Sequence, residues 1–167
     1  ERYAIARRQA WGSAEQPGLD LMAYVHRNPE GGSNSGRPYE GTVVPHAGQK
    51  SASAFLEGED KYVKYDRREN MVGYNIEHAF DSGWSVRQKL RYLHTKVDLN
   101  QVYAAGWLNE TELNRGYSGS DESLSAVTLD NQIDGSVDTG IVNHRLLLGV
   151  DYQRRSNNVT ASYGSFQ

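Results

Sequence analysis

Residues 71–92, MVGYNIEHAF-DSG-WSVRQKLRY, decide the fold class. In residues 71–80, and again in residues 84–92, apolar or aromatic side chains alternate with polar or charged ones. This period of two is typical of β-strands with two different faces. The intervening Asp81-Ser82-Gly83 has the composition of a tight turn. We therefore predict a β-hairpin with one apolar face and one charged face.

The charged face of this hairpin carries Arg87, Lys89 and Arg91 on one strand. Three cations would be costly in a dry core. They suit a polar or water-filled lumen. Opposite charges that could pair with them across the strands are Glu77, Asp130, Asp134 and Asp151.

Two further hairpins are predicted. Residues 127–138 and 142–153 repeat the alternation around a turn at 138–140, and a weaker pair, 3–11 and 19–25, flanks a turn at 14–18. The first run of that pair is interrupted by Arg7 and Gln9 on its otherwise apolar face. We expect an all-β antiparallel meander of about six strands.

The connections alternate in length. The three turns are short, whereas polar stretches at roughly 27–69, 104–122 and from about 154 onward are long. Short turns at one end and long loops at the other are typical of outer-membrane β-barrels. Aromatic residues near the strand ends would form interfacial girdles: Tyr3, Trp11, Phe80, Trp84, Tyr92 and Tyr152. The alternative is a self-contained small β-barrel or β-sandwich that acts as a binding module.

Composition sets further limits. The 167 residues include no cysteine, which excludes a disulfide scaffold and thiolate chemistry. The net charge of −3 gives no reason to expect nucleic-acid binding. No apolar run is long enough for a transmembrane helix. The chain begins without a leader or methionine, so we expect a processed protein or an excised piece.

Five segments of the chain are distinctive: PYEGTV (38–43), MVGYNIEHAF (71–80), WSVRQKLRY (84–92), VTLDNQ (127–132) and LLLGVDYQ (146–153). Together, and in this order, they resemble TonB-dependent siderophore receptors of the hydroxamate (ferrichrome and ferrioxamine) type. The resemblance covers nearly the whole chain.

The resemblance implies that residues 1–167 are part of a transmembrane β-barrel of about 22 strands in the outer membrane of a Gram-negative bacterium, in contact with its lipid. The expected ligand is a ferric hydroxamate siderophore, in which iron arrives already chelated, so no cofactor is expected. The plug domain and the TonB box are not found in this segment. Contact with TonB would therefore run through an N-terminal plug region outside it.

The resemblance also suggests site residues. Tyr103 and Tyr163 match aromatic ligand-facing positions, and we add the nearby Tyr39 and Trp107 as siderophore contacts. Other aromatic positions of the family fall on Asn34, Gly36 and Ala105 here and do not carry over. Alternatively, each aromatic residue packs a loop or lies among lipid headgroups. The predicted lumen-facing or plug-facing cations are Arg87, Lys89, Arg91 and Arg145.

Other chemistries find little support in the sequence. The five histidines lack the spacing of a metal site. The acidic run at 57–60 lacks the spacing of a calcium loop. Nucleophile-elbow, phosphate-loop and paired-histidine motifs are missing, so no enzyme is expected. A hydrolase using loop Asp and His residues is the least favoured alternative.

Overall fold

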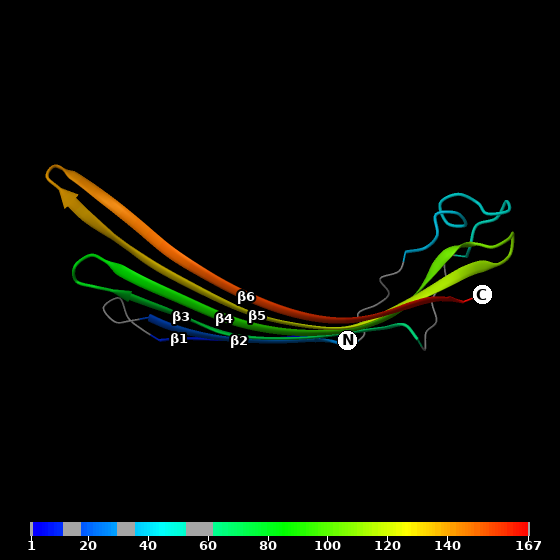
Figure 1. Ribbon diagram of the computed structural model, residues 1–167, viewed down its shortest axis with the longest axis horizontal. Coiled ribbons are helices and arrows are strands. Elements are labelled where there is room, and N and C mark those ends of the chain that lie inside the picture. Colours follow the sequence, from blue (N-terminus) through cyan, green and yellow to red (C-terminus); the bar gives the residue numbers. More distant parts are fainter. Residues whose placement is uncertain (1, 12–17, 30–35, 53–61, 167) are drawn as a thin grey trace.

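The computed structural model describes residues 2–11, 18–29, 36–52 and 62–166. These residues form one antiparallel sheet in which each strand pairs with the next along the chain (Figure 1). No helix in these ranges is long and apolar enough to cross a membrane. The predicted six-stranded meander is confirmed. Its strands are β1 (Tyr3–Trp11), β2 (Gly18–Asn28), β3 (Lys64–Ala79), β4 (Ser85–Trp107), β5 (Leu113–Thr139) and β6 (Val142–Phe166).

The strand register joins the predicted alternation into two continuous faces. Arg87 lies opposite Glu77 on β3, and Lys89 lies opposite Asp130 on β5. We call the face that carries these residues the charged face. Leu90 lies opposite Tyr74 and Leu129 on the other face, which we call the apolar face. Because side chains alternate along a strand, each residue's face follows from its place in this register.

Two predicted loops are strands. β4 continues to Trp107 and β5 begins at Leu113, so only residues 108–112 connect them, and β6 continues to Phe166. The predictions of loops at 104–122 and from about 154 were therefore wrong. In these segments both faces are polar, so hydrophobic alternation disappears although backbone pairing continues. The long connection after β2 is confirmed with narrower bounds than the predicted 27–69, because β2 ends at Asn28 and β3 already begins at Lys64.

The apolar residues of the apolar face form a band that runs obliquely to the register. The register joins Tyr3, at the loop end of the band on β1, through Arg27, Arg68, Lys96 and Ser123 to Asn158 on β6. On β6, however, the band ends at Tyr152. From β1 to β6, the band therefore shifts toward the end of the sheet that carries the short turns. Strands tilted by roughly 35–45° from the membrane normal produce such a shift.

Exposed aromatic residues mark both borders of this band. Tyr3, Tyr92 and Tyr152 lie at its loop end, and Trp11 and Phe80 lie at its turn end; all five are 40–55% exposed. This arrangement fits the predicted interfacial girdles. Beyond the loop-end border the apolar face becomes charged. There Lys64 pairs with Asp98, and Arg68 lies 2.7 Å from Asp66.

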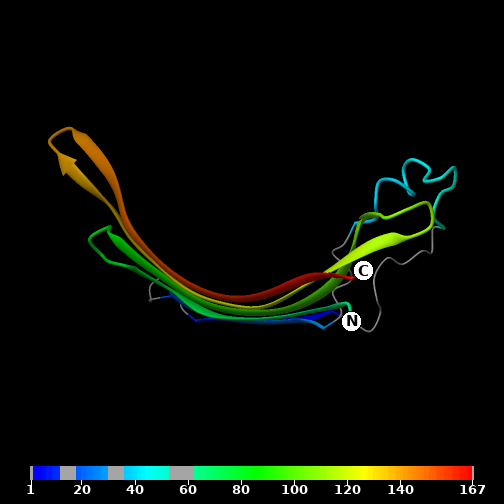
Figure 2. The ribbon, with the colours of Figure 1, turned by 45° about the vertical axis from the view of Figure 1, so that its right-hand side comes forward.

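The part of the sheet that the structure describes encloses no hydrophobic core. Among the described residues Val102 is the single buried hydrophobic side chain, whereas residues such as Ile5, Leu148 and Val150 remain 64–71% exposed. Figures 1 and 2 show one curved layer with the short turns at one end and residues 36–52 at the other. In the described part of the chain β1 does not pair with β6, so the alternative of a closed small barrel or a sandwich is not observed.

Candidate ligand-binding face and loop cluster

The predicted cations lie together on the charged face. Asp134 lies between two of them: Arg87 Nη2 is 3.5 Å from Asp134 Oδ1, and Arg145 Nη2 is 3.9 Å from Asp134 Oδ2. Lys89 lies opposite Asp130, which in turn lies opposite Asp151 on β6. The predicted acidic partners therefore accompany the cations across the strands. That the cations contact a plug stays a prediction.

Arg91 extends this group along β4. A Cβ atom added to Gly73, its partner on β3, would lie 3.2 Å from Arg91 Cγ and 2.5 Å from the Leu90 carbonyl oxygen. The close Leu90 carbonyl leaves room only for a glycine at position 73, and the Arg91 side chain packs over it. Farther across the sheet, a polar hollow is lined by Lys89, Arg91, Thr128, Asp130 and Asp151.

Tyr103 and Tyr163 lie on the charged face at its loop end. The register joins Tyr103 to Gly116, and it joins Tyr163 through Ser118 to Gln101. The Tyr103 ring covers Gly116, where an added Cβ would lie 2.6 Å from Cζ. Tyr163 is 82% exposed and Tyr103 is 36% exposed. The two predicted contact residues thus share one face across three strands.

Two polar residues that lie between these tyrosines, Gln101 and Ser118, form a hydrogen bond that the sequence analysis did not predict. Gln101 Nε2 donates to Ser118 Oγ over 2.9 Å, on the row next to Tyr103.

Ala105 lies at a register shift between Ala104 and Gly106, a β-bulge near the end of β4. Bulges commonly redirect side chains near binding sites. The sequence contained no signal for the bulge except Gly106.

Trp107 packs the loop residues 36–52 against the β4–β5 hairpin. Its ring stacks on His46 with the centroids 3.9 Å apart and the planes at 10°. Its Nε1 donates to the Glu40 carbonyl oxygen over 2.9 Å. Gly41, at φ 96°, lies so close that an added Cβ would be 2.9 Å from Trp107 Cζ2. Tyr39, the other aromatic residue predicted here, is 65% exposed.

His46 is a member of this loop cluster that sequence reasoning did not single out. Its Nδ1 lies 3.0 Å from Glu40 Oε1, and its Nε2 lies 3.0 Å from the Asn109 carbonyl oxygen. The Glu40 carboxylate, and after it the Asn109 carbonyl, raise the pKa of His46 above its ordinary value. The only available signal was its closeness in sequence to the PYEGTV segment.

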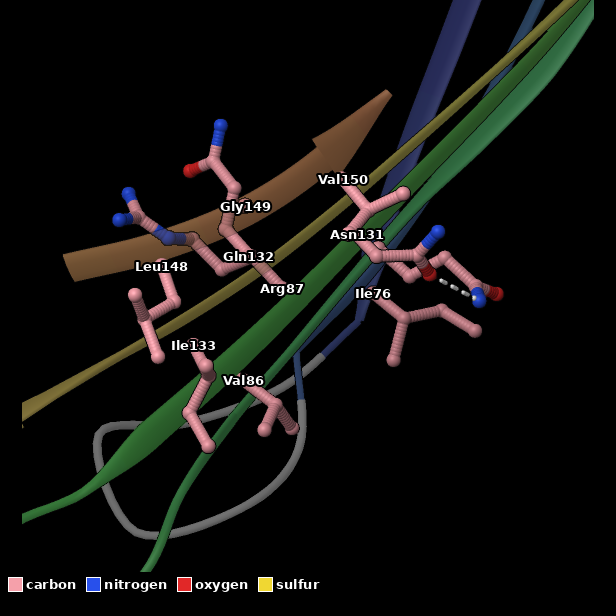
Figure 3. A pocket seen from close by; sticks show the side chains of 10 residues that line it. Ile76, Val86, Arg87, Asn131, Gln132, Ile133, Leu148, Gly149 and Val150 are labelled. Carbon is pink, nitrogen blue, oxygen red and sulfur yellow. Dashed lines mark hydrogen bonds between the residues drawn. The ribbon is translucent and has the colours of Figure 1, made fainter. Parts of the chain in front are cut away.

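The apolar face carries a hollow of different character (Figure 3). Its apolar-face lining consists of Ile76, Val86, Gln88, Asn131, Ile133, Leu148 and Val150. Three residues that the register assigns to the charged face, Arg87, Gln132 and Gly149, also line it. Two of the lining residues, Gln88 and Asn131, belong to a hydrogen-bonded chain. Tyr74 Oη donates to Gln88 Oε1 over 2.7 Å, and Gln88 Nε2 donates to Asn131 Oδ1 over 2.7 Å. Polar groups paired in this way can face hydrocarbon.

Several sequence expectations concern residues outside the described ranges. These are Asn34, the acidic run at 57–60 and the predicted turn before Gly18. Gly36 is described and exposed. Within the described ranges, no group of three His, Asp or Glu residues could hold a metal ion.

Comparison with known proteins identifies the family. The sequence model of one protein family, described as TonB dependent receptor-like, beta-barrel, matches residues 10–167. The chain belongs to this family. The outer membrane of a Gram-negative bacterium, which the resemblance predicted as its location, is confirmed. The total of 22 strands and the partial-barrel assignment of residues 1–167 stay predictions.

Individual relatives are receptors or transporters. The chain is 71% identical over 166 residues to the ferrioxamine B receptor of Salmonella typhimurium SL1344, covering 99% of the chain and 24% of the relative. It is 40% identical to the ferrioxamine receptor of Yersinia enterocolitica, covering 95% and 22%. It is 33% identical to the ferrichrome outer membrane transporter and phage receptor of Escherichia coli K12, covering 98% and 24%. The chain thus spans about a quarter of the length of these relatives.

Proposed function

We propose that the whole protein takes up a ferric hydroxamate siderophore of the ferrioxamine type across the outer membrane, in a TonB-dependent manner. The 71% identity to a ferrioxamine B receptor supports this substrate class over ferrichrome, whose transporter is 33% identical. The observation that carries the proposal is the position of Tyr103 and Tyr163. Both lie on the charged face at the loop end, where a ligand entering a lumen would meet them first.

The chemistry of the ligand fits such a surface. Hydroxamate groups already saturate the iron, so the receptor needs aromatic walls and a few hydrogen-bond donors, not metal ligands of its own. Tyr103 and Tyr163 supply exposed rings and hydroxyl groups on one face. Gln101 and Ser118 add polar groups between them. Tyr39 and Trp107 would contribute from the loop end. No cofactor is required, and iron is cargo.

The part of the charged face nearer the short turns suits a second role, the docking of a plug domain. Arg87 and Arg145 near Asp134, with Lys89 and Arg91 beside them, present a mixed-charge surface of partly exposed groups. A plug domain bearing complementary polar groups could dock there through ion pairs and waters. Energy relayed by TonB to the plug would then shift it and release the siderophore. No covalent bond changes, so we assign transport and not catalysis.

Iron uptake in cells tests this proposal. The gene for the full-length protein is expressed in a strain that lacks other hydroxamate receptors, and uptake of ⁵⁵Fe is measured with ferrioxamine B or ferrichrome. We expect ferrioxamine B to support uptake that disappears when TonB is deleted. Uptake of ferrichrome alone would contradict the assigned substrate. Uptake of neither siderophore, with the protein folded in the membrane, would refute the proposed function.

A further inference from the structure

The loop cluster contains a histidine whose two ring nitrogens both face acceptors. Glu40 Oε1 and the Asn109 carbonyl oxygen each lie 3.0 Å from one nitrogen of His46. A carbonyl and an ionised carboxylate can only accept hydrogen bonds. A neutral imidazole carries one N–H, so it can satisfy one of these contacts and sets a lone pair against the other. The doubly protonated ring donates to both.

The same ring joins two segments that are distant in sequence. Glu40 and His46 belong to residues 36–52, whereas Asn109 lies in the turn 108–112 that follows β4. Trp107 strengthens the junction through its stack on His46 and its hydrogen bond to the Glu40 carbonyl. A cation stacked on an indole is stabilised further by the ring's negative face. The His46 side chain is only 15% exposed, whereas that of Glu40 is 56% exposed.

We propose that a doubly protonated His46 holds residues 36–52 against the β4–β5 hairpin, as a latch that is closed at acidic pH and opens as the solution becomes alkaline. The loop end of the sheet is the extracellular end in this family of barrels, so the latch faces the medium. The protonation state of His46 would set the fraction of molecules in which residues 36–52, which include Tyr39, are docked beside Trp107.

The direction of the pH dependence follows from linkage. The docked loop raises the pKa of His46, chiefly through Glu40. The docked state therefore binds the proton more tightly than the released state does. Its extra stability is fully present below the ordinary histidine pKa of 6.5 and is lost as the pH rises through the raised value.

The surrounding charges favour the cationic ring. Glu110, from the turn 108–112, also raises the pKa of His46. Glu112 accepts a hydrogen bond from the Asn109 side chain and so orders the turn that presents the carbonyl. Lys50, from the loop, is the cation among the described residues that line the same hollow as His46. Carboxylates thus approach the ring from both segments.

Hydrogen exchange of the loop tests the latch. The full-length receptor in lipid nanodiscs, without siderophore, is followed by mass spectrometry from about pH 5.5 to about pH 9, values that bracket the ordinary histidine pKa. The reporters are backbone amides that bond within the loop, those of Gly41, His46, Gln49 and Ser51. After correction for intrinsic exchange rates, we expect protection at the acidic end and its loss at the alkaline end.

Variants assign the effect to His46. His46→Phe keeps a ring for stacking but removes both hydrogen bonds, so protection should be low at every pH. Glu40→Gln removes the charge that raises the pKa, so the loss should occur at lower pH. His94→Phe replaces a histidine of β4 that is hydrogen-bonded to Ser125 of β5; it is the matched control and should behave as the wild type.

Three results would overturn the latch. These are pH-independent protection in the wild type, full protection in His46→Phe at acidic pH, and an unshifted transition in Glu40→Gln. Because no siderophore is present, failure of the proposed transport function would leave this experiment unaffected. Because Glu40→Gln keeps the loop packing around Trp107, it tests the latch even where His46→Phe does not fold.

Discussion

Gly73 shows how a single residue shapes the charged face. A methyl group at this position would meet the Leu90 carbonyl oxygen at 2.5 Å, and a backbone atom cannot move aside as a flexible side chain can. We predict that Gly73→Ala destabilises the full-length receptor by about 1–3 kcal/mol because the β3–β4 ladder must shift. The unfolding midpoint in denaturant measures this.

Gly149 provides the matched control for that substitution. It is also a strand glycine on the charged face, but an added Cβ would approach no atom closer than 3.4 Å. Gly149→Ala should therefore leave the midpoint unchanged or raise it slightly. Equal midpoints for the two variants would show that the close contact at Gly73 does not constrain the sheet.

Residue-level features differed in how far the sequence could predict them. The face of Arg87, Lys89 and Arg91 followed from strict alternation, and the structure agrees. The stack of His46 on Trp107 joins residues far apart in the chain, and no local pattern reports such a pair. Tyr103 and Tyr163 came from family resemblance alone. Their shared face became visible only when the register was known.

At the scale of strands, the chain Tyr74–Gln88–Asn131 joins β3, β4 and β5 on the apolar face. We predict that Gln88→Leu lowers stability by about 1–3 kcal/mol, because it leaves Tyr74 and Asn131 without partners at a surface that faces hydrocarbon. The same denaturant unfolding experiment measures the change. Gln153→Leu, at an exposed position of β6 on the charged face, is the control. A Gln88→Leu receptor as stable as the control would contradict the assignment of this face to lipid.

Strand length was the element-level feature that the sequence concealed. Alternation identifies a strand only where one face is apolar, so it located the part of each strand inside the lipid band. Beyond the band, β4, β5 and β6 continue with polar residues on both faces. Backbone hydrogen bonds continue the ladder there, and they leave no compositional trace. The loops predicted at 104–122 and from about 154 were wrong for this reason.

At the scale of the whole molecule, the described residues form a single open, curved β-sheet. The sheet has unpaired edges at β1 and β6, no enclosed core, and an apolar band that runs obliquely across its strands. An isolated sheet with such edges would tend to pair with other chains. Each of these features becomes favourable in a tilted barrel, where neighbouring strands cover the edges and lipid covers the band. In such a barrel the charged face would line the lumen, as predicted, and the two tyrosines would lie at its loop end.

The affinity of the full-length receptor for ferric ferrioxamine B, measured for Tyr103→Ala and Tyr163→Ala beside Tyr152→Ala, tests this account most directly. Tyr152 is a matched control because it is an exposed tyrosine of the lipid-facing band. We predict that each of the first two substitutions weakens binding by roughly fivefold or more, since truncating an important contact side chain costs about 1 kcal/mol or more. Tyr152→Ala should bind as the wild type does. Unchanged affinity in both Tyr103→Ala and Tyr163→Ala would contradict the claim that the charged face receives the siderophore.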